Sequence, residues 1–283
     1  MGAVSVVNAL ACGSGATVAV NLPTSARVAV EEHRGRWRVT MNGKTTESTF
    51  AALTAEAAIR LLGRNPASYS GTIDTTTSTP VGVGLKTSSS SSVAIILALF
   101  SAFREKPRRA LDVLRCSASA SIAAGVSVTG AMDDAASCFM GGANFVDNAS
   151  GKVFSSFRVG VPKQVLIRVP PIRSRRSAVP LAYAKRFSGL AASIFETGRQ
   201  GRLWKAMTLN GLLYSAIYGY PQRESIDALR VGALGSGLSG TGPAVAAVFD
   251  GRDEMESLVG IWDSGGATLI RTETSDGGAV IGI

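Results

Sequence analysis

The stretch from Pro80 to Ser92 reads Pro-Val-Gly-Val-Gly-Leu-Lys-Thr-Ser-Ser-Ser-Ser-Ser and joins a predicted strand to a predicted helix. Its glycines let backbone amides approach an anion, its hydroxyls add donors, and Lys86 adds a positive charge. The amino end of the following helix contributes a dipole that favours negative charge. The stretch therefore predicts a phosphate-binding loop, with a serine linker or a serine helix cap as the alternative. It is not a Walker A loop, because Leu85 stands where that pattern has glycine.

The segments around this loop predict a mixed order of strands and helices. Alternating β-branched and small residues predict strands joined by turns over residues 1–40. Helical spacing of apolar residues predicts helices over 50–62, 88–103, 108–124, 182–197, 203–218 and 225–230. Short apolar runs predict strands over 69–73, 144–147, 153–159, 164–169, 244–249, 268–272 and 279–283. Because strands and helices do not alternate strictly, the order predicts an α+β fold.

The size of the chain allows two lobes around a real core. It has 283 residues, 46% hydrophobic and 17% charged. Two prolines at 170–171 and the basic loop after them predict a division into an N-terminal lobe, 1–170, and a C-terminal lobe, 171–283. The longest apolar run, 93–103, has about half of the roughly 20 residues that span a bilayer, and no secretory signal is present. We therefore expect a cytoplasmic protein without a membrane partner.

Positive charge is concentrated in one part of the chain. The net charge is +9, and residues 149–194 contain nine Lys and Arg but no Asp or Glu. Such a field can solubilise the protein, attract small anionic substrates or bind nucleic acid. Only 6% of residues are aromatic and they form no stacking motif of the kind that binds RNA. A small-molecule substrate without nucleic acid is the interpretation favoured here, and a basic nucleic-acid-binding module is the alternative from a different class.

Two further segments carry candidate functional residues. Between Thr129 and Gly142, Asp133 and Asp134 stand among small apolar residues, which predicts a buried carboxylate that orients a hydroxyl or holds magnesium. The alternative is a pair of acids that stabilises a helix N-terminus. The segment from Gly235 to Pro243 is rich in glycine and predicts a loop that approaches a ligand, or a plain turn. His33 is the only histidine, so a multi-histidine metal site is excluded.

Taken together and in this order, the three segments resemble the signature of the GHMP small-molecule kinases, and the resemblance spans nearly the whole chain. The family pattern Pro-x-x-x-Gly-Leu-x-Ser-Ser is matched by Pro80, Gly84, Leu85 and Ser88. Lys86 stands in place of the usual glycine, and Thr87 in place of the first serine. The Asp and Gly-Gly motif is matched by Asp134 and Gly141-Gly142, and the C-terminal glycine motif by residues 238–242.

A subgroup is also indicated by the motifs. Gly84-Leu85-Lys86 followed by hydroxyl residues, together with Thr129-Gly130-Ala131-Met132-Asp133-Asp134, is similar to the archaeal-type shikimate kinases. The stretches Asn8-Ala9 and Gly13-Ser14-Gly15-Ala16 resemble the same subgroup. The resemblance implies phosphorylation of the 3-hydroxyl of shikimate to shikimate 3-phosphate, a step of chorismate and aromatic amino acid biosynthesis. Another GHMP activity, such as homoserine kinase, is the alternative.

The family resemblance also implies a fold and a mechanism. The fold is a two-lobe α+β arrangement with a ribosomal S5 domain 2-like N-terminal lobe and a ferredoxin-like C-terminal lobe. The γ-phosphoryl group of ATP passes directly to a substrate hydroxyl, with magnesium and without a covalent intermediate. Phosphoryl transfer of this kind depends chiefly on positioning and charge neutralisation.

The resemblance assigns roles residue by residue. Asp134 is the expected catalytic base or orienting group, Asp133 is its close alternative, and Lys86 neutralises phosphate charge. Ser88 is the expected magnesium ligand, and the usual glutamate ligand has no counterpart. The expected ATP-binding residues are Pro80, Gly82, Val83, Gly84, Leu85, Lys86, Thr87, Ser88, Ser89 and Ser90. The expected substrate-binding residues are Asn8, Thr17, Arg27, Gly237, Ser239, Gly240 and Thr241. A substrate carboxylate calls for a bidentate arginine, for which the candidates are Arg27, Arg168 and Arg173.

Overall fold

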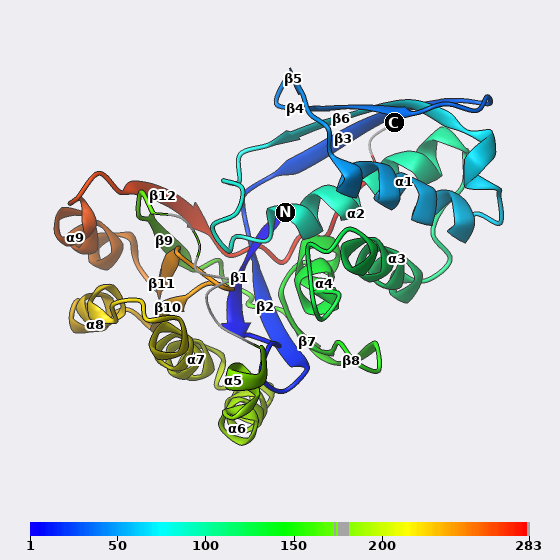
Figure 1. Cartoon of the computed structure of the whole chain (residues 1–283). Coiled ribbons are helices and arrows are strands. Elements are labelled where there is room, and N and C mark those ends of the chain that lie inside the picture. The colour runs from blue at the N-terminus through cyan, green and yellow to red at the C-terminus, as the bar shows by residue number, and fades with distance from the viewer. Residues whose placement is uncertain (173, 175–180, 282–283) are drawn as a thin grey trace.

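Buried strands of small and β-branched residues form the centre of the molecule. The computed structural model describes residues 1–172, 174 and 181–281. The first antiparallel sheet has the order β1-β2-β7-β8, with β1 (Gly2–Val7), β2 (Ser14–Val20), β7 (Ala143–Asp147) and β8 (Lys152–Phe157). Strands β1 and β2 lie between two groups of helices (Figure 1), which explains why nearly all of their residues are buried.

The N-terminal lobe adds a second sheet and four α-helices. The sheet order is β3-β6-β4-β5, with β3 (Thr24–Glu31), β6 (Ser70–Thr77), β4 (Trp37–Met41) and β5 (Lys44–Thr45). The helices are α1 (Thr49–Leu61), α2 (Thr87–Ala102), α3 (Ala110–Ala123) and α4 (Met132–Met140), with a short 3-10 helix at Pro66–Ser68. Apolar residues of α2 such as Ile96 and Leu99 are fully buried between this sheet and the other helices, so α2 forms the centre of this lobe.

The C-terminal lobe is an antiparallel sheet with helices packed against it. Its strands are β9 (Gln164–Val169), β10 (Gly235–Leu238), β11 (Val245–Phe249) and β12 (Thr268–Glu273). Its helices are α5 (Leu181–Lys185), α6 (Ser188–Arg199), α7 (Leu203–Tyr218), α8 (Arg223–Arg230) and α9 (Arg252–Trp262). Read from its β12 edge, the sheet has the order fourth, first, third, second, which is the ferredoxin-like order. The predicted α+β fold is confirmed.

The predicted lobe boundary and one predicted helix differ from the structure. Strand β9 precedes the predicted division at 170/171, yet it pairs with β11 and β12 of the second sheet. The single helix predicted over 182–197 is two helices, α5 and α6, because the chain turns at Arg186 and Phe187, whose amides bond to Tyr183 and Ala184. No helix in the described part of the chain combines the length and the apolar character that crossing a bilayer requires.

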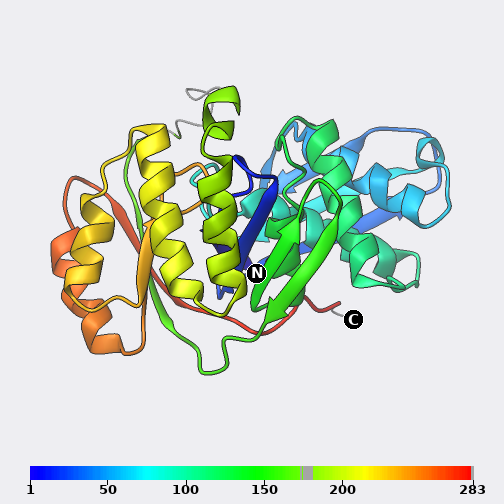
Figure 2. The same cartoon turned by 90° about the horizontal axis from the view of Figure 1, so that it is seen from below.

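The chain returns from the second lobe to the first after β12 (Figure 2). Ser275 donates a backbone hydrogen bond to Ala19 at 3.0 Å, and Ala279 donates one to Phe139 at 2.7 Å. The Gly141-Gly142 pair permits this crossing, because a Cβ on Gly141 would lie 2.6 Å from the backbone oxygen of Asp276. A strand was predicted over 279–283. Residues 279–281 do not form it, and 282–283 lie outside the described residues.

Candidate active site

A cavity of about 500 Å³ brings the three predicted segments together. The N-termini of α2 and α4 and the loop after β10 all contribute to its wall. The predicted residues that line it are Asn8, Gly82, Gly84, Leu85, Lys86, Thr87, Ser88, Ser89, Asp133, Asp134, Gly240 and Thr241. The segments that sequence patterns singled out for phosphate binding and for catalysis therefore face the same cavity.

The predicted phosphate loop has the backbone that an anion site needs. Gly82 and Gly84 adopt φ angles of +77° and +91°, which side chains rarely permit. Lys86 also adopts a left-handed conformation, directly before the first turn of α2, and no side chain caps this helix. The amides of the first turn are thus open to a ligand, and Ser88 presents an exposed hydroxyl beside them. This is the geometry of an anion site at a helix N-terminus.

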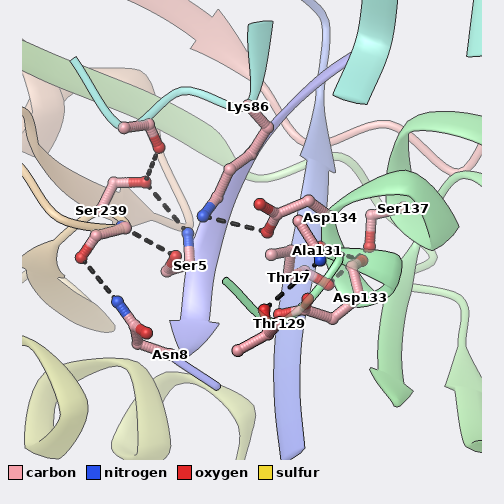
Figure 3. Close-up of polar contacts among 12 residues, drawn as sticks. Ser5, Asn8, Thr17, Lys86, Thr129, Ala131, Asp133, Asp134, Ser137 and Ser239 are labelled. Carbon is pink, nitrogen blue, oxygen red and sulfur yellow. Dashed lines mark hydrogen bonds and ion pairs between the residues drawn. The ribbon is translucent and has the colours of Figure 1, made fainter. Parts of the chain in front are cut away.

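The second lobe holds this loop in place through Ser239. Its hydroxyl donates to the backbone oxygen of Gly84 at 2.8 Å and accepts from the amide of Ser5 at 3.1 Å (Figure 3). The side-chain amide of Asn8 donates to the oxygen of Gly240 at 2.8 Å. A Cβ on Gly84 would lie 2.0 Å from the oxygen of Ser239. The glycine-rich C-terminal segment therefore clamps the phosphate loop from the opposite lobe.

A lysine at the end of this loop forms an ion pair with an aspartate of α4. The Lys86 ammonium lies 3.0 Å from Oδ1 of Asp134, and the two side chains are only 9% and 17% exposed (Figure 3). Both residues line the cavity. The pair places one positive and one negative group side by side where a phosphate and a hydroxyl can meet, which suits phosphoryl transfer.

Asp133 is held differently from its neighbour Asp134. Its Oδ1 accepts a hydrogen bond from Nδ2 of Asn148 at 2.8 Å, and its backbone amide donates to Oδ1 of the same residue at 3.0 Å. Burial and the adjacent Asp134 carboxylate raise the pKa of Asp133 to about 7. A Cβ on Gly15 would lie 2.1 Å from Oδ2 of Asp133, so β2 needs glycine there. Asn148 was not among the predicted site residues, because nothing in the local sequence links it to residue 133.

The raised pKa of Asp133 predicts a pH dependence of stability. Its value of about 7 in the folded protein exceeds the ordinary 3.8, so the folded state binds more protons between these two pH values. The free energy of unfolding therefore falls as pH rises through this window, by up to about 1.4 kcal/mol per pH unit from this group. Urea denaturation at several pH values should show that slope, and Asp133→Asn should remove it. Equal slopes in both proteins would contradict the buried, ionisable carboxylate.

Two residues predicted to bind substrate do not line the cavity. Arg27 is exposed on β3, and the side chains that line the cavity do not include it. Thr17 is fully buried on β2, and its hydroxyl donates to the backbone oxygen of Asp133 at 2.9 Å. Thr17 thus fixes the start of α4, and the geometry gives no support to a substrate contact for either residue.

Other predicted ligand residues also serve packing. Gly237 lies on β10, where a Cβ would come within 2.7 Å of the Gly211 Cα of α7. The hydroxyl of Ser90 is buried and donates to the oxygen of Thr87 at 3.0 Å. Besides Thr17 and Arg27, the residues predicted to contact ligands that are not part of the cavity wall are Pro80, Val83, Ser90, Gly237 and Ser239. They support the loop and the strand beside it.

Arg168, one of the candidates for binding a substrate carboxylate, has its guanidinium engaged by other groups of the protein. Its guanidinium donates to the backbone oxygens of Trp262 at 3.1 Å and Ser264 at 3.0 Å, and it pairs with Glu224 at 3.5 Å. Arg173 lies outside the described residues. Its neighbour Ser174 is described and lines the cavity.

Several wall residues were not predicted to contact a ligand. Ala9, Thr129 and Ala131 stand in the quoted motifs but were given no role. The others carry no motif and are Leu10, Ser121, Val126, Ser127, Val128, Ser174, Leu181 and Tyr218. They reach the cavity from connections and helix ends of both lobes. Their residue types are ordinary for loops and cores, so only the tertiary structure brings them to the site.

The cavity between the lobes has the parts that a small-molecule kinase needs: an uncapped, glycine-rich helix start for phosphates and a carboxylate beside a lysine for the acceptor. Residues 48–142 match the family model of the GHMP kinases N terminal domain, and residues 190–267 match that of the GHMP kinases C terminal domain. The chain belongs to the GHMP kinase family, and ATP is the phosphoryl donor that membership implies.

Two curated relatives match this chain over nearly its full length. A protein of Methanothrix thermoacetophila named shikimate kinase is 33% identical over 99% of this chain and 94% of its own length. A Halobacterium salinarum protein with the same name is 33% identical over 97% of this chain and 95% of its own. In both comparisons the match extends across both lobes.

Solved structures share the fold at low sequence identity. The mevalonate kinase of Methanococcus jannaschii superposes with a TM-score of 0.75 at 13% identity, over 96% of each chain. A homoserine kinase from Cytophaga hutchinsonii gives 0.72 at 19% identity, over 97% of this chain and 94% of that chain. The two-lobe GHMP kinase fold is confirmed.

Proposed function

We propose that this protein transfers the γ-phosphoryl group of ATP to the 3-hydroxyl of shikimate and forms shikimate 3-phosphate for aromatic amino acid biosynthesis. The observation that carries the proposal is the 33% identity, over nearly the full length of both chains, to curated shikimate kinases. The geometry supports it, because the phosphate loop, Lys86 and Asp134 meet in one cavity. A cytoplasmic location follows from the proposed use of ATP in biosynthesis.

Each part of the cavity takes one role in this proposal. The backbone of Gly82 to Ser89 binds the ATP phosphates at the N-terminus of α2. Asp134 accepts a hydrogen bond from the acceptor hydroxyl and orients it, or takes its proton, during transfer. Lys86 neutralises charge on the transferred phosphoryl group and keeps Asp134 in place.

The oxygen ligands that the cavity offers can bind magnesium only together with the phosphates of ATP. Ser88 offers an exposed hydroxyl oxygen in the cavity, a hard ligand of the kind magnesium prefers. No group of three or more His, Cys, Asp or Glu that would bind a metal alone is found among the described residues. The phosphates of ATP therefore supply the remaining ligands in this proposal, and the metal supplies charge neutralisation.

Removing the Ser88 hydroxyl should weaken the response to magnesium. We expect Ser88→Ala to raise the magnesium concentration needed for half-maximal activity by about 10-fold, since one ligand is lost. Titration of initial rates at fixed ATP measures this. Ser193→Ala, on the exposed surface of α6, is the matched control. An unchanged metal titration in Ser88→Ala would remove Ser88 from the proposed ligand set.

The acceptor is tested by magnesium-dependent ADP release with shikimate, homoserine and mevalonate offered separately against a blank without acceptor. The proposal expects turnover above the blank with shikimate alone. Turnover with homoserine or mevalonate instead would overturn the proposed substrate within the same family. Salt-dependent RNA binding without ATP turnover would favour the basic nucleic-acid module, although Lys163 and Arg168 of the basic segment are already paired with Asp250 and Glu224.

A further inference from the structure

The two adjacent carboxylates on the first turn of α4 have different surroundings. Asp134 makes an ion pair with Lys86, which stands at the start of α2. Asp133 is 4% exposed and lies against β2, where Gly15 leaves room for its Oδ2. Both carboxylates belong to residues of the cavity wall. One cavity thus contains two carboxylates with separate environments.

Asp133 is built as a fixed hydrogen-bond acceptor. Among the described residues, Asn148 is the only side chain that donates to its carboxylate, and this bond occupies Oδ1. Asn148 also accepts from the amide of Asp133, and Thr17 donates to its backbone oxygen. These three contacts hold Asp133 against β2, through Thr17, and against the end of β7, through Asn148. Within the described structure, no cation contacts its carboxylate. A buried carboxylate with one neutral donor is costly unless a further donor meets it.

We propose that Asp133 accepts a hydrogen bond from a second hydroxyl of the acceptor, next to the hydroxyl that is phosphorylated, and so makes the site selective for vicinal diols. The inference rests on the proposed function and assigns Asp133 and Asp134 separate tasks. Asp134, beside Lys86 and the phosphate loop, faces the reacting hydroxyl. Asp133, one residue earlier on the same turn, binds the neighbouring hydroxyl. In shikimate that neighbour is the 4-hydroxyl.

The experiment compares two acceptors in three proteins. The acceptors are shikimate and 4-deoxyshikimate, and the proteins are the wild type, Asp133→Asn and the control Asp147→Asn. Asp147 shapes the turn after β7 by accepting from Ala149 and Ser150, and it is not part of the cavity wall. The values of kcat and KM for each combination are measured at saturating ATP.

We expect the wild type to lose about 10- to 100-fold in kcat/KM when the 4-hydroxyl is missing, mostly through KM. Asp133→Asn should lose a similar factor with shikimate and little more with 4-deoxyshikimate, because both changes remove one hydrogen bond. Asp147→Asn should discriminate between the acceptors as the wild type does. A purely structural role of Asp133 predicts equal losses with both acceptors, and that result would overturn the proposal. Wild-type protein inactive with shikimate would instead overturn the proposed function and this inference with it.

A second measurement does not depend on the folding of the variant. Lowering the pH below about 7 should reduce the wild-type preference for shikimate over 4-deoxyshikimate, because a protonated Asp133 is a weaker acceptor. The other ionisable groups near Asp133 are Lys86, Asp134, Cys12, Cys138 and Tyr214. The pKa values of both thiols and of the phenol are raised by burial, so these three stay neutral. Lys86 and Asp134 face the reacting hydroxyl and affect both acceptors alike. A preference independent of pH would contradict the proposal.

Discussion

Asp134→Asn should lower kcat for shikimate phosphorylation by about 10³-fold or more, while KM for ATP changes little. The substitution keeps the size of the side chain but removes the charge that pairs with Lys86 at 3.0 Å. It also removes the group proposed to orient or deprotonate the acceptor hydroxyl, a contribution of about 10²- to 10⁴-fold in acid–base catalysis. Steady-state kinetics with varied shikimate and varied ATP separate the two parameters.

The control for this prediction is Asp112→Asn. Asp112 lies in the first turn of α3, forms an ion pair with Arg109 just before the helix, and is not part of the cavity wall. Its kinetics should match the wild type, and thermal unfolding should show that both variants are folded. Turnover within a few fold of the wild type in Asp134→Asn would remove Asp134 from the catalytic role and leave Asp133 as the alternative.

Lys86→Gly should separate activity from stability at one position. Glycine fits the left-handed conformation of residue 86, with φ of 65°, better than lysine does by about 1 kcal/mol. Removing one partner of this largely buried ion pair costs about 3 kcal/mol, of which the glycine gain offsets about 1, so we expect the free energy of unfolding to fall by about 2 kcal/mol. Removing the only cation of the described cavity wall should lower kcat by about 10²- to 10³-fold.

Lys163→Ala is the matched control, because Lys163 pairs with Asp250 far from the cavity wall. Kinetics and urea denaturation are measured for both variants. A stable Lys86→Gly protein with unchanged kcat would show that Lys86 serves only the structure of the loop. An unfolding free energy equal to that of the wild type would instead show that the ion pair contributes no more to stability than the backbone strain costs.

The backbone of the predicted phosphate loop and the start of α2 could be predicted from the sequence because their determinants are local. Glycines, hydroxyls and a lysine stand within a few residues of a helix start, and the structure places the start of α2 at Thr87. The helix predicted over 203–218 coincides with α7 for the same reason, since one apolar pattern runs uninterrupted between its ends. Residues joined by such short-range patterns need no knowledge of the tertiary structure.

The glycine-rich segment after Gly235 shows where local reasoning fails. Its first four residues form strand β10, although glycines usually indicate a turn. Glycine is needed at position 237 because α7 packs so closely against β10 that Gly211 and Gly237 meet without side chains between them. Which residue lies opposite Gly237 is a long-range property, and sequence patterns do not contain it.

The candidate site was predicted in its motifs but not in its division of labour. Asp133 and Asp134 are equivalent in sequence, and they differ because Asn148 and Gly15 surround one while Lys86 pairs with the other. Thr17 was predicted to bind substrate, yet its hydroxyl donates to the backbone oxygen of Asp133 at the start of α4. The contact of Asn148 spans 15 residues and that of Thr17 spans 116, and no local pattern marks either of them, so they required the structure.

The central claim, transfer of the γ-phosphoryl group to the 3-hydroxyl of shikimate, is tested most directly by identifying the product. The purified protein is incubated with ATP, magnesium and shikimate, and ¹H–³¹P correlation spectroscopy shows which carbon carries the phosphate. We predict one phosphorylated product, with the phosphorus coupled to the proton on C3. Phosphate on another hydroxyl, or release of inorganic phosphate without a phosphorylated acceptor, would contradict the claim.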